Sequence, residues 1–157
     1  MAGYATGETF FVSQALGLRH SHLDSGGYSY DQKPKGKNVE DAVKFLVQDE
    51  KARCLLNSMV SCLFARGVYT DEVLGNCLRS VCYDILADNI DTIATEIQRL
   101  RWKMRVRSGY QPENITIPKR FTEITTWKGP LDRQFLEALK TAYGQRIMDL
   151  AGIEKGA

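Results

Sequence analysis

The stretch DNIDTIATEIQRLRWKMRVR, residues 88–107, contains the longest regular hydrophobic pattern of the chain. Its apolar side chains recur every three or four positions, which is the period of one helix face. They are Ile90, Ile93, Ala94, Ile97, Leu100 and Met104. The second half of the stretch also alternates with the period of a strand. Because the helical period begins well upstream, we predict a helix from Asp88 to Arg107, ended by Ser108 and Gly109.

Further helical patterns lie upstream of this stretch. The spacing of apolar residues predicts a short helix over residues 8–18. Asn38 is a favourable N-cap and predicts a helix that runs to about residue 49. The next segment, residues 51–66, is apolar over much of its circumference and predicts another helix, which Gly67 ends.

The connections are also visible in the sequence. Thr70, followed by Asp-Glu-Val, predicts the start of a short helix that runs to about residue 81. The glycine pair and small polar residues of 25–31 predict an ordered loop, and residues 32–38 predict a solvated basic turn.

Downstream of the long helix, residues 109–130 hold three of the four prolines and predict an extended connection. A final helix is predicted over residues 131–151, with Gly152 as its C-cap. We find neither an internal repeat nor a credible sheet in the pattern. The predicted fold class is therefore all-α, an irregular multi-helix domain with ordered loops.

The totals describe an ordinary globular chain. With 157 residues, 43% of them hydrophobic and 25% charged, we expect a single helical domain over residues 1–157. Collagen-like and low-complexity classes are excluded. Lys plus Arg number 21 against 19 Asp plus Glu, a balance that does not call for nucleic acid. No membrane span or signal peptide is predicted, and four cysteines without a Cys-x-x-Cys pair indicate a reducing cytoplasm.

Three groups of residues are candidates for chemistry. In an extended segment His20, His22 and Asp24 would point the same way, which suits a zinc ion, an acid/base pair or simple backbone bonding. Cys62 is a lone thiol on a mostly apolar segment, either a small hydrophobe or the distant ligand of a site built elsewhere. The basic run Arg99–Arg107 is either a solvated helix face or a surface for phosphate or nucleic acid.

Four motifs of the chain follow one another in the order in which a known enzyme family has them. The segment GLRHSHLDSGGYSYDQ, residues 17–32, is similar to the family's Arg-His-Ser-His-Leu-Asp-x-x-Gly-Tyr-Ser. Asn57-Ser-Met-Val-Ser-Cys62 stands where the family has Asp-x-x-Gly-Leu-Cys, so Asn replaces Asp and Val-Ser replaces Gly-Leu. Residues 105–110 are similar to Asn-x-Arg-Glu-Gly-Phe, and residues 117–121 to Leu-Pro-x-Arg-Phe. With these motifs the chain resembles the C-terminal part of the tungsten-containing aldehyde:ferredoxin oxidoreductase family.

The resemblance implies roles for single residues. It makes Cys62 the fourth ligand of a 4Fe–4S cluster, and it makes Asn57 and Ser61 contacts of the pterin. It makes His20, with His22 as the alternate, the group that assists proton transfer near the metal. The family's cofactor is tungsten, sometimes molybdenum, held by two pyranopterins, and its reaction oxidises an aldehyde to an acid and passes electrons to ferredoxin.

The resemblance also implies that most of the cofactor cradle lies elsewhere. The family's β-rich N-terminal domain, its three clustered cysteines and its first pterin motif are not among these residues. We therefore expect the chain alone to bind no cofactor and to be inert. Its partners would be the missing N-terminal domains, ferredoxin and the aldehyde, and an exposed apolar surface would favour self-association. The rival hypotheses are a helical interaction or nucleic-acid-binding module using Arg99–Arg107, and a small zinc protein.

Overall fold

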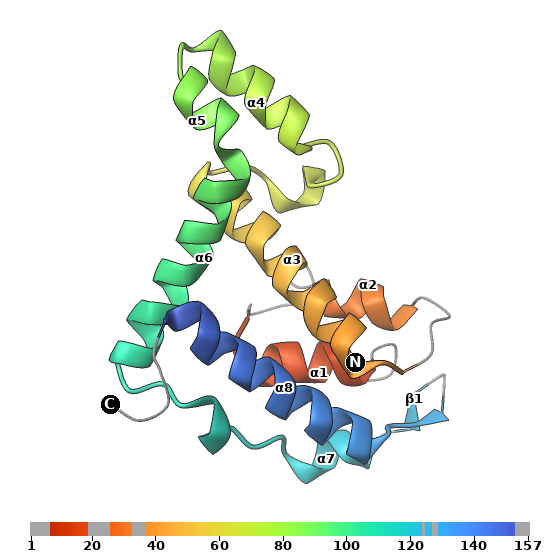
Figure 1. Ribbon diagram of the computed structural model, residues 1–157. Helices are drawn as coiled ribbons and strands as arrows, with labels where there is room; N and C mark the ends of the chain where they lie inside the picture. Colours follow the sequence, from red (N-terminus) through yellow and green to blue (C-terminus); the bar gives the residue numbers. More distant parts are fainter. Residues whose placement is uncertain (1–6, 19–25, 33–36, 124, 127–128, 153–157) are drawn as a thin grey trace.

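The structure is a computed structural model that describes residues 7–18, 26–32, 37–123, 125–126 and 129–152. Its elements, in chain order (Figure 1), are α1 (Glu8–Ala15), α2 (Gly27–Gln32), α3 (Val39–Ser58), η2 (Leu63–Ala65), α4 (Asp71–Ser80), α5 (Asp84–Asp88), α6 (Ile90–Arg107), η3 (Pro112–Asn114), α7 (Lys119–Thr122), β1 (Thr125–Thr126), β2 (Gly129–Pro130) and α8 (Arg133–Ala151). The strands pair antiparallel over two residues each. The predicted all-α class is confirmed.

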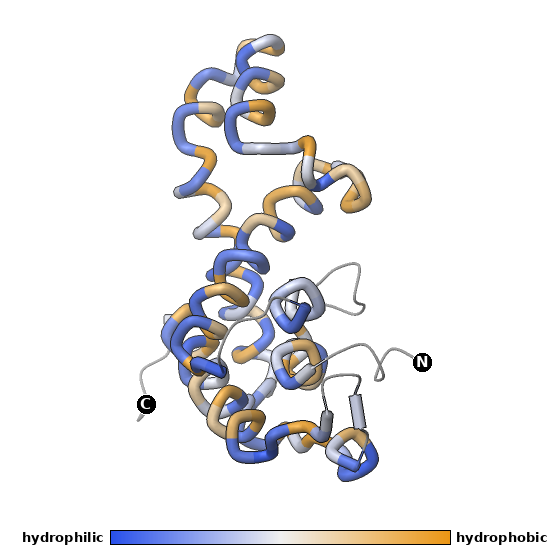
Figure 2. The backbone as a smooth tube through the Cα atoms, turned by 90° about the vertical axis from the view of Figure 1, so that its right-hand side faces the viewer, coloured by the Kyte–Doolittle hydropathy of each residue, from blue (hydrophilic) through white to orange (hydrophobic). Residues whose placement is uncertain are grey.

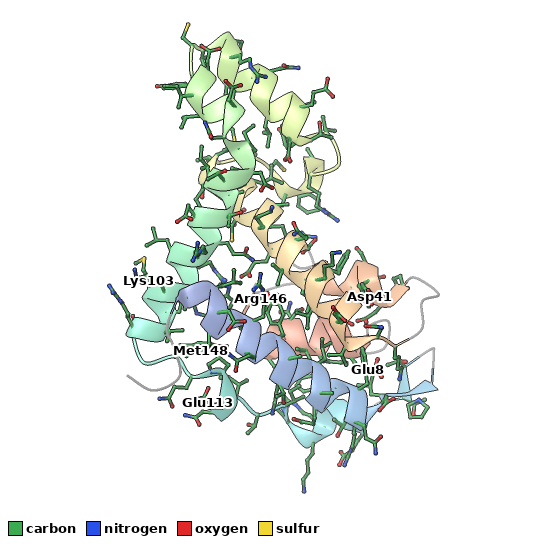
Figure 3. The ribbon with its side chains drawn as sticks, in the orientation of Figure 1. Glu8, Asp41, Lys103, Glu113, Arg146 and Met148 are labelled. Carbon is green, nitrogen blue, oxygen red and sulfur yellow. The ribbon has the colours of Figure 1, made fainter. Side chains whose placement is uncertain are left out.

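The helices α3, α6 and α8 pack against one another, and α1 packs against α8 and α2 (Figure 1). We call these elements the main body. Its core contains fully buried aromatic and aliphatic side chains from every long helix: Val12, Leu16, Leu46, Trp102, Leu139, Tyr143 and Ile147. Burial of this set is the principal source of the fold's stability. Glu8 adds a polar tie between α1 and the start of α8 (Figure 3), because its carboxylate accepts the backbone N–H of Asp132 at 2.6 Å.

Residues 59–89, which include η2, α4 and α5, form an outer lobe. The lobe stands on the far ends of α3 and α6 and extends away from the main body in both views (Figures 1 and 2). Its core is a small cluster shared with those helix ends: Leu55, Leu56, Leu74, Ile90 and Ala94. Most of the large apolar side chains that are exposed among the described residues also belong to the lobe, and the others are Leu100 and Met104 of α6.

The predicted helix caps are confirmed at three sites. The side chain of Asn38 accepts the N–H of Asp41 at 3.0 Å at the start of α3. That of Thr70 accepts the N–H of Val73 at 3.3 Å at the start of α4. Gly152 adopts a left-handed conformation, with φ of +65°, at the end of α8. These caps depend on residues within one helical turn, which is why the sequence predicts them.

The predicted division of residues 38–66 into two helices is wrong. α3 runs without a break from Val39 to Ser58. The polar residues near position 49 do not end it, because Asp49 pairs with Arg53 one turn later at 2.7 Å and Glu50 is buried. Gly67 is not the C-cap, since the left-handed residue that ends α3 is Val60.

The predicted loop over residues 25–31 is also wrong in its described part, because Gly27–Gln32 form α2. Gly27 serves close packing there. A Cβ atom at this position would lie 2.9 Å from the Cα of Phe10, so only glycine lets α2 approach α1. The sequence pattern also missed α5.

The face predicted for α6 is correct in its first half and wrong in its second. Ile90 and Ala94 are buried, but Leu100 and Met104 are 58% and 61% exposed. In their place Gln98 and Trp102 point inward and are buried. Burial of the Gln98 and Trp102 side chains requires a hydrogen-bond acceptor for their N–H groups, and Glu50 of α3 supplies it.

Candidate functional site

The candidate ligands His20, His22 and Asp24 lie in residues 19–25, outside the described residues. Their roles in zinc binding or proton transfer therefore stay predictions. The structure does describe the residues on both sides of this segment, Gly17–Leu18 and Gly26, together with the side chains that bind them.

The candidate cofactor residues Asn57, Ser61 and Cys62 surround the end of α3. The N–H of Val60 donates to the carbonyl of Asn57 at 3.0 Å, and the N–H of Ser61 donates to the carbonyl of Leu56 at 2.9 Å. These two bonds form a Schellman motif, which turns the chain sharply away from the helix axis. Asn57 and Cys62 are both exposed after this turn, while Ser61 is half-buried.

Val60 occupies the left-handed position of the turn with φ of +55°. Glycine is the usual residue there, and a β-branched residue is an outlier. The motif that this segment resembles, Asp-x-x-Gly-Leu-Cys, has a glycine at this position, and glycine adopts this conformation without strain. The sequence shows the replacement, but only the structure shows its conformational consequence.

Cys62 follows the turn in extended conformation, with φ of −71° and ψ of 120°, and precedes η2. Its thiol is exposed, unlike that of Cys54, which is buried within α3. Cys77 in α4 and Cys82 between α4 and α5 are also exposed. Among the described residues, no three His, Cys, Asp or Glu side chains gather closely enough to hold a metal ion. The exposed Cys62 thiol is one potential ligand.

A buried polar cluster lies in the main body between α3, α6 and α8. The carboxylate of Glu50 accepts hydrogen bonds from Gln98 at 2.8 Å, Trp102 at 2.9 Å and Tyr143 at 3.1 Å. Arg101 donates to its second oxygen. Burial, followed by the charge of Glu50, raises the pKa of Tyr143 well above its ordinary value. The phenol therefore stays protonated and can donate.

The basic run does not form one solvated face. Arg101 donates to the carbonyl oxygens of Gly17 at 2.8 Å and Leu18 at 2.6 Å, and Arg105 donates to Gly17 at 2.6 Å. Both guanidinium groups stack on Trp102, with centroid distances of 4.6 and 4.9 Å. Burial lowers the pKa of Arg105.

The other cations of the run point outward. Arg99, Lys103 and Arg107 are exposed, and Lys103 is labelled in Figure 3. These three cations form one row along α6, and Arg101 and Arg105 form a second row, which binds the chain itself. A phosphate or nucleic-acid surface would have only the outer row.

Within the described ranges, no helix is both long and apolar enough to cross a membrane.

The helical fold and a sequence match now place the chain in a class, that of a helical domain of an oxidoreductase family. Residues 5–155 match the model of aldehyde ferredoxin oxidoreductase, domains 2 and 3. The chain belongs to the aldehyde ferredoxin oxidoreductase family. Comparisons with curated proteins and with solved structures found no match.

Proposed function

We propose that the chain is the helical C-terminal domain of an enzyme that oxidises aldehydes to carboxylic acids and passes the electrons to ferredoxin. The observation that carries this proposal is the family match over residues 5–155. The exposed thiol of Cys62 at the end of α3 supports it, because the aligned motif ends in a cysteine at this position. The domain is a part of the oxidoreductase and is inert alone.

The chemistry of the donors fits the implied groups. Iron–sulfur clusters are bound by cysteine thiolates, and an exposed thiol that follows a fixed turn is accessible to a cluster on another domain. We assign Cys62 the role of its single ligand from this chain.

Asn57 and Ser61 are the proposed pterin contacts. Asn57 is exposed and is the last residue but one of α3. Its amide can both donate and accept, whereas the family's carboxylate only accepts, and the hydroxyl of Ser61 adds a second donor and acceptor. When bound, the tungsten or molybdenum bis-pyranopterin supplies the oxidation chemistry and the cluster carries the electrons. The chain's share is to bind, orient and move protons.

Proton handling is assigned to His20, with His22 as the alternate. An imidazole changes its charge near pH 6.5, which suits a group that accepts and returns a proton close to neutrality. The proposed partners are the cofactor-bearing domain, ferredoxin and the aldehyde, and the proposed compartment is the cytoplasm. The exposed apolar side chains of the outer lobe, such as Phe64 at 77% exposure, favour association with that domain or with another copy.

The decisive experiment compares Cys62→Ser with Cys77→Ser, which removes another exposed thiol from α4. Each variant is assembled anaerobically with the cofactor-bearing domain, and iron content and the reduced cluster's electron paramagnetic resonance spectrum are measured. We expect Cys62→Ser to lose or alter the cluster and Cys77→Ser to keep it. A full, unchanged cluster in Cys62→Ser would refute the ligand assignment.

Metal analysis and nucleic-acid binding of the chain alone test the two rival hypotheses, a small zinc protein and a nucleic-acid-binding or interaction module. No iron, tungsten, molybdenum or zinc is expected. Stoichiometric zinc that survives a chelator wash would favour a site at His20, His22 and Asp24. Binding to DNA or RNA that weakens steeply with salt would instead favour the interaction module.

A further inference from the structure

Helices α5 and α6 follow one another along an outer edge of the molecule, and only Asn89 separates them (Figure 1). We call residues 84–107 the α5–α6 edge. Its charges are divided between its two ends. Residues 84–98 carry four carboxylates and neither Lys nor Arg, whereas residues 99–107 carry five Lys or Arg and no carboxylate. The edge is therefore acidic where it begins and basic where it ends.

The basic end presents a row of cations to solvent. Arg99, Lys103 and Arg107 are exposed and recur every four residues, which places them on one side of α6. Arg99 has Glu96 as an exposed neighbour at 3.5 Å. Among the described residues no ion pair involves Lys103, which Figure 3 labels on α6, or Arg107. Both side chains are thus available to a carboxylate of another molecule.

The acidic end has the same spacing. Asp84 and Asp88 of α5 are exposed and lie four residues apart, as Lys103 and Arg107 do. Asp88 also accepts a bond from Arg79 at 2.6 Å, and this pair is itself exposed. When the edges of two copies are laid antiparallel, Asp84 of one comes opposite Arg107 of the other. In the same register Asp88 comes opposite Lys103, so both carboxylates meet cations.

Apolar side chains are exposed beside the charges at both ends. They are Ile85 and Leu86 at the acidic end and Leu100 and Met104 at the basic end. The antiparallel register that matches the charges also brings Ile85 and Leu86 of one copy close to Met104 of the other. Apolar side chains in such a position lose contact with water, which adds free energy of association to the charge pairs.

The two ends of the edge cannot meet within one copy. α6 has 18 residues, and at 1.5 Å per residue it holds the ends about 27 Å apart. A nucleic acid would be attracted to the basic end but repelled by the carboxylates of the acidic end. An acidic protein would also match only one end. A second copy in the reverse direction matches the charge and the apolar surface at both ends.

We infer that the α5–α6 edge is a docking surface for a second copy of the chain, which lies antiparallel to the first about a two-fold axis. Each contact then occurs twice, so the interface closes on itself and yields a dimer rather than a filament. The inference goes beyond the proposed function and does not rest on it. Phe64 and Cys62 are not part of this edge.

The test measures self-association of the 157-residue chain by sedimentation velocity over a range of concentrations. Arg107→Asp makes both ends of the edge acidic, and Asp84→Arg makes both ends basic. Each variant places like charges opposite each other at two contacts of the dimer. We expect each to raise the dimer dissociation constant about tenfold or more. Arg133→Asp is the matched control, because it reverses an exposed arginine of α8 outside the edge and should leave the dissociation constant unchanged.

An equimolar mixture of Arg107→Asp and Asp84→Arg gives the sharpest result. One protein then offers two carboxylates and the other two guanidinium groups, so a dimer with one copy of each restores both attractive contacts. We expect the mixture to associate about as tightly as the unmodified chain, although neither variant does so alone. Both substituted side chains are exposed, and circular dichroism verifies that each variant is folded.

The apolar contribution is tested by Met104→Ser, with Phe64→Ser as its control, since both side chains are exposed but only Met104 lies on the edge. We expect Met104→Ser to weaken the dimer and Phe64→Ser to leave it unchanged. A chain that stays monomeric up to about 1 mM would overturn the inference. So would a mixture that associates no better than its components, or a dimer that the Phe64→Ser or Arg133→Asp control weakens as much as the edge variants do.

Discussion

The main body and the outer lobe differ in how they treat polar and apolar groups. The main body buries charge as well as hydrocarbon, since Glu50 lies at its centre with four donors around it. The outer lobe exposes hydrocarbon, with Val60 at 93%, Phe64 at 77% and Ile85 at 80%. The main body pairs its central carboxylate within the chain, and the outer lobe leaves apolar side chains exposed to solvent.

The difference shows which region of the chain is stabilised by contacts within the chain itself. A buried carboxylate is tolerated only when its hydrogen bonds are complete, so the main body is fixed by its own contacts. Exposed apolar side chains add no burial free energy to the stability of an isolated chain. This contrast makes the outer lobe the candidate surface for contact with other domains.

The largest expected effect comes from removing the centre of the main body. Glu50→Ala leaves Arg101, Trp102 and Tyr143 without their acceptor and should lower the free energy of unfolding by about 3–5 kcal/mol. Asp91→Ala is the control, because Asp91 is the exposed partner of Lys51 and its loss should cost no more than about 1 kcal/mol. Urea unfolding followed by circular dichroism measures both. Equal losses in the two variants would mean that the buried cluster is not central to the fold.

The next largest difference is expected when an apolar side chain in each region is truncated to alanine and the loss of stability is compared. Leu139 is fully buried in α8, so Leu139→Ala should cost about 3 kcal/mol. Phe64 in the outer lobe is mostly exposed, and Phe64→Ala should change stability by less than about 0.5 kcal/mol. The same urea titration compares them. A large loss in Phe64→Ala would show that the lobe is packed in the isolated chain, against the contrast drawn above.

The sequence predicted the parts of the fold that depend on near neighbours. Asn38 and Thr70 cap their helices with backbone groups three residues away, and the motif that ends in Cys62 was visible as a pattern. What the sequence could not show depends on distant partners. Gly27 looked like a loop residue because its neighbour Phe10 is unknown until α1 and α2 pack.

The inward turn of Trp102 has the same origin. Its face of α6 is buried only because Glu50, 52 positions earlier in the chain, supplies an acceptor. A helical-period count ranks Leu100 and Met104 as better core residues, and a pattern within one helix carries no information about that acceptor. The left-handed φ of Val60 was hidden for a related reason, since a valine gives no local indication of a glycine-like turn.

A smaller effect is expected in the pH dependence of the stability of the main body. The carboxylate of Asp31 in α2 accepts N–H groups of Gly7 at 3.0 Å, Thr9 at 3.3 Å and Phe10 at 2.9 Å at the start of α1. Burial outweighs these bonds and raises the pKa of Asp31 to about 6, above the ordinary 3.8. The folded chain therefore holds this proton more tightly than the unfolded chain does.

Stability contributed by Asp31 should consequently be greatest below about pH 4 and should fall as the pH rises through about 6. At roughly 1.4 kcal/mol per pKa unit the decrease is at most about 3 kcal/mol. Asp31→Asn, which does not titrate, should remove this part of the slope, although it weakens the bonds to α1. The measurement is urea unfolding of both proteins from pH 4 to pH 8. Parallel pH profiles would show that Asp31 titrates normally.

The smallest expected effect is a gain in stability from a change at Val60, where α3 of the main body leads into the outer lobe. Val60 lies in a left-handed conformation that costs a side-chain-bearing residue about 1–2 kcal/mol, and its 93% exposed side chain offers no burial in return. Val60→Gly removes the strain but adds about 0.5–1 kcal/mol of unfolded-state entropy. The net result should be a stabilisation of about 0.5–1 kcal/mol.

Val68→Gly is the matched control, because Val68 is 65% exposed in the same lobe and is not among the residues with positive φ. It has no strain to relieve and should lose about 0.5–1 kcal/mol. Opposite signs in the two variants would show that the turn before Cys62 keeps its geometry against the preference of its own residue. In that case valine at position 60 does not serve the stability of the isolated chain, and its exposed side chain belongs to the same unused apolar surface as Phe64. Equal losses of stability in the two variants would instead mean that the turn at Val60 is unstrained. Val60 would then be an ordinary exposed residue of the outer lobe.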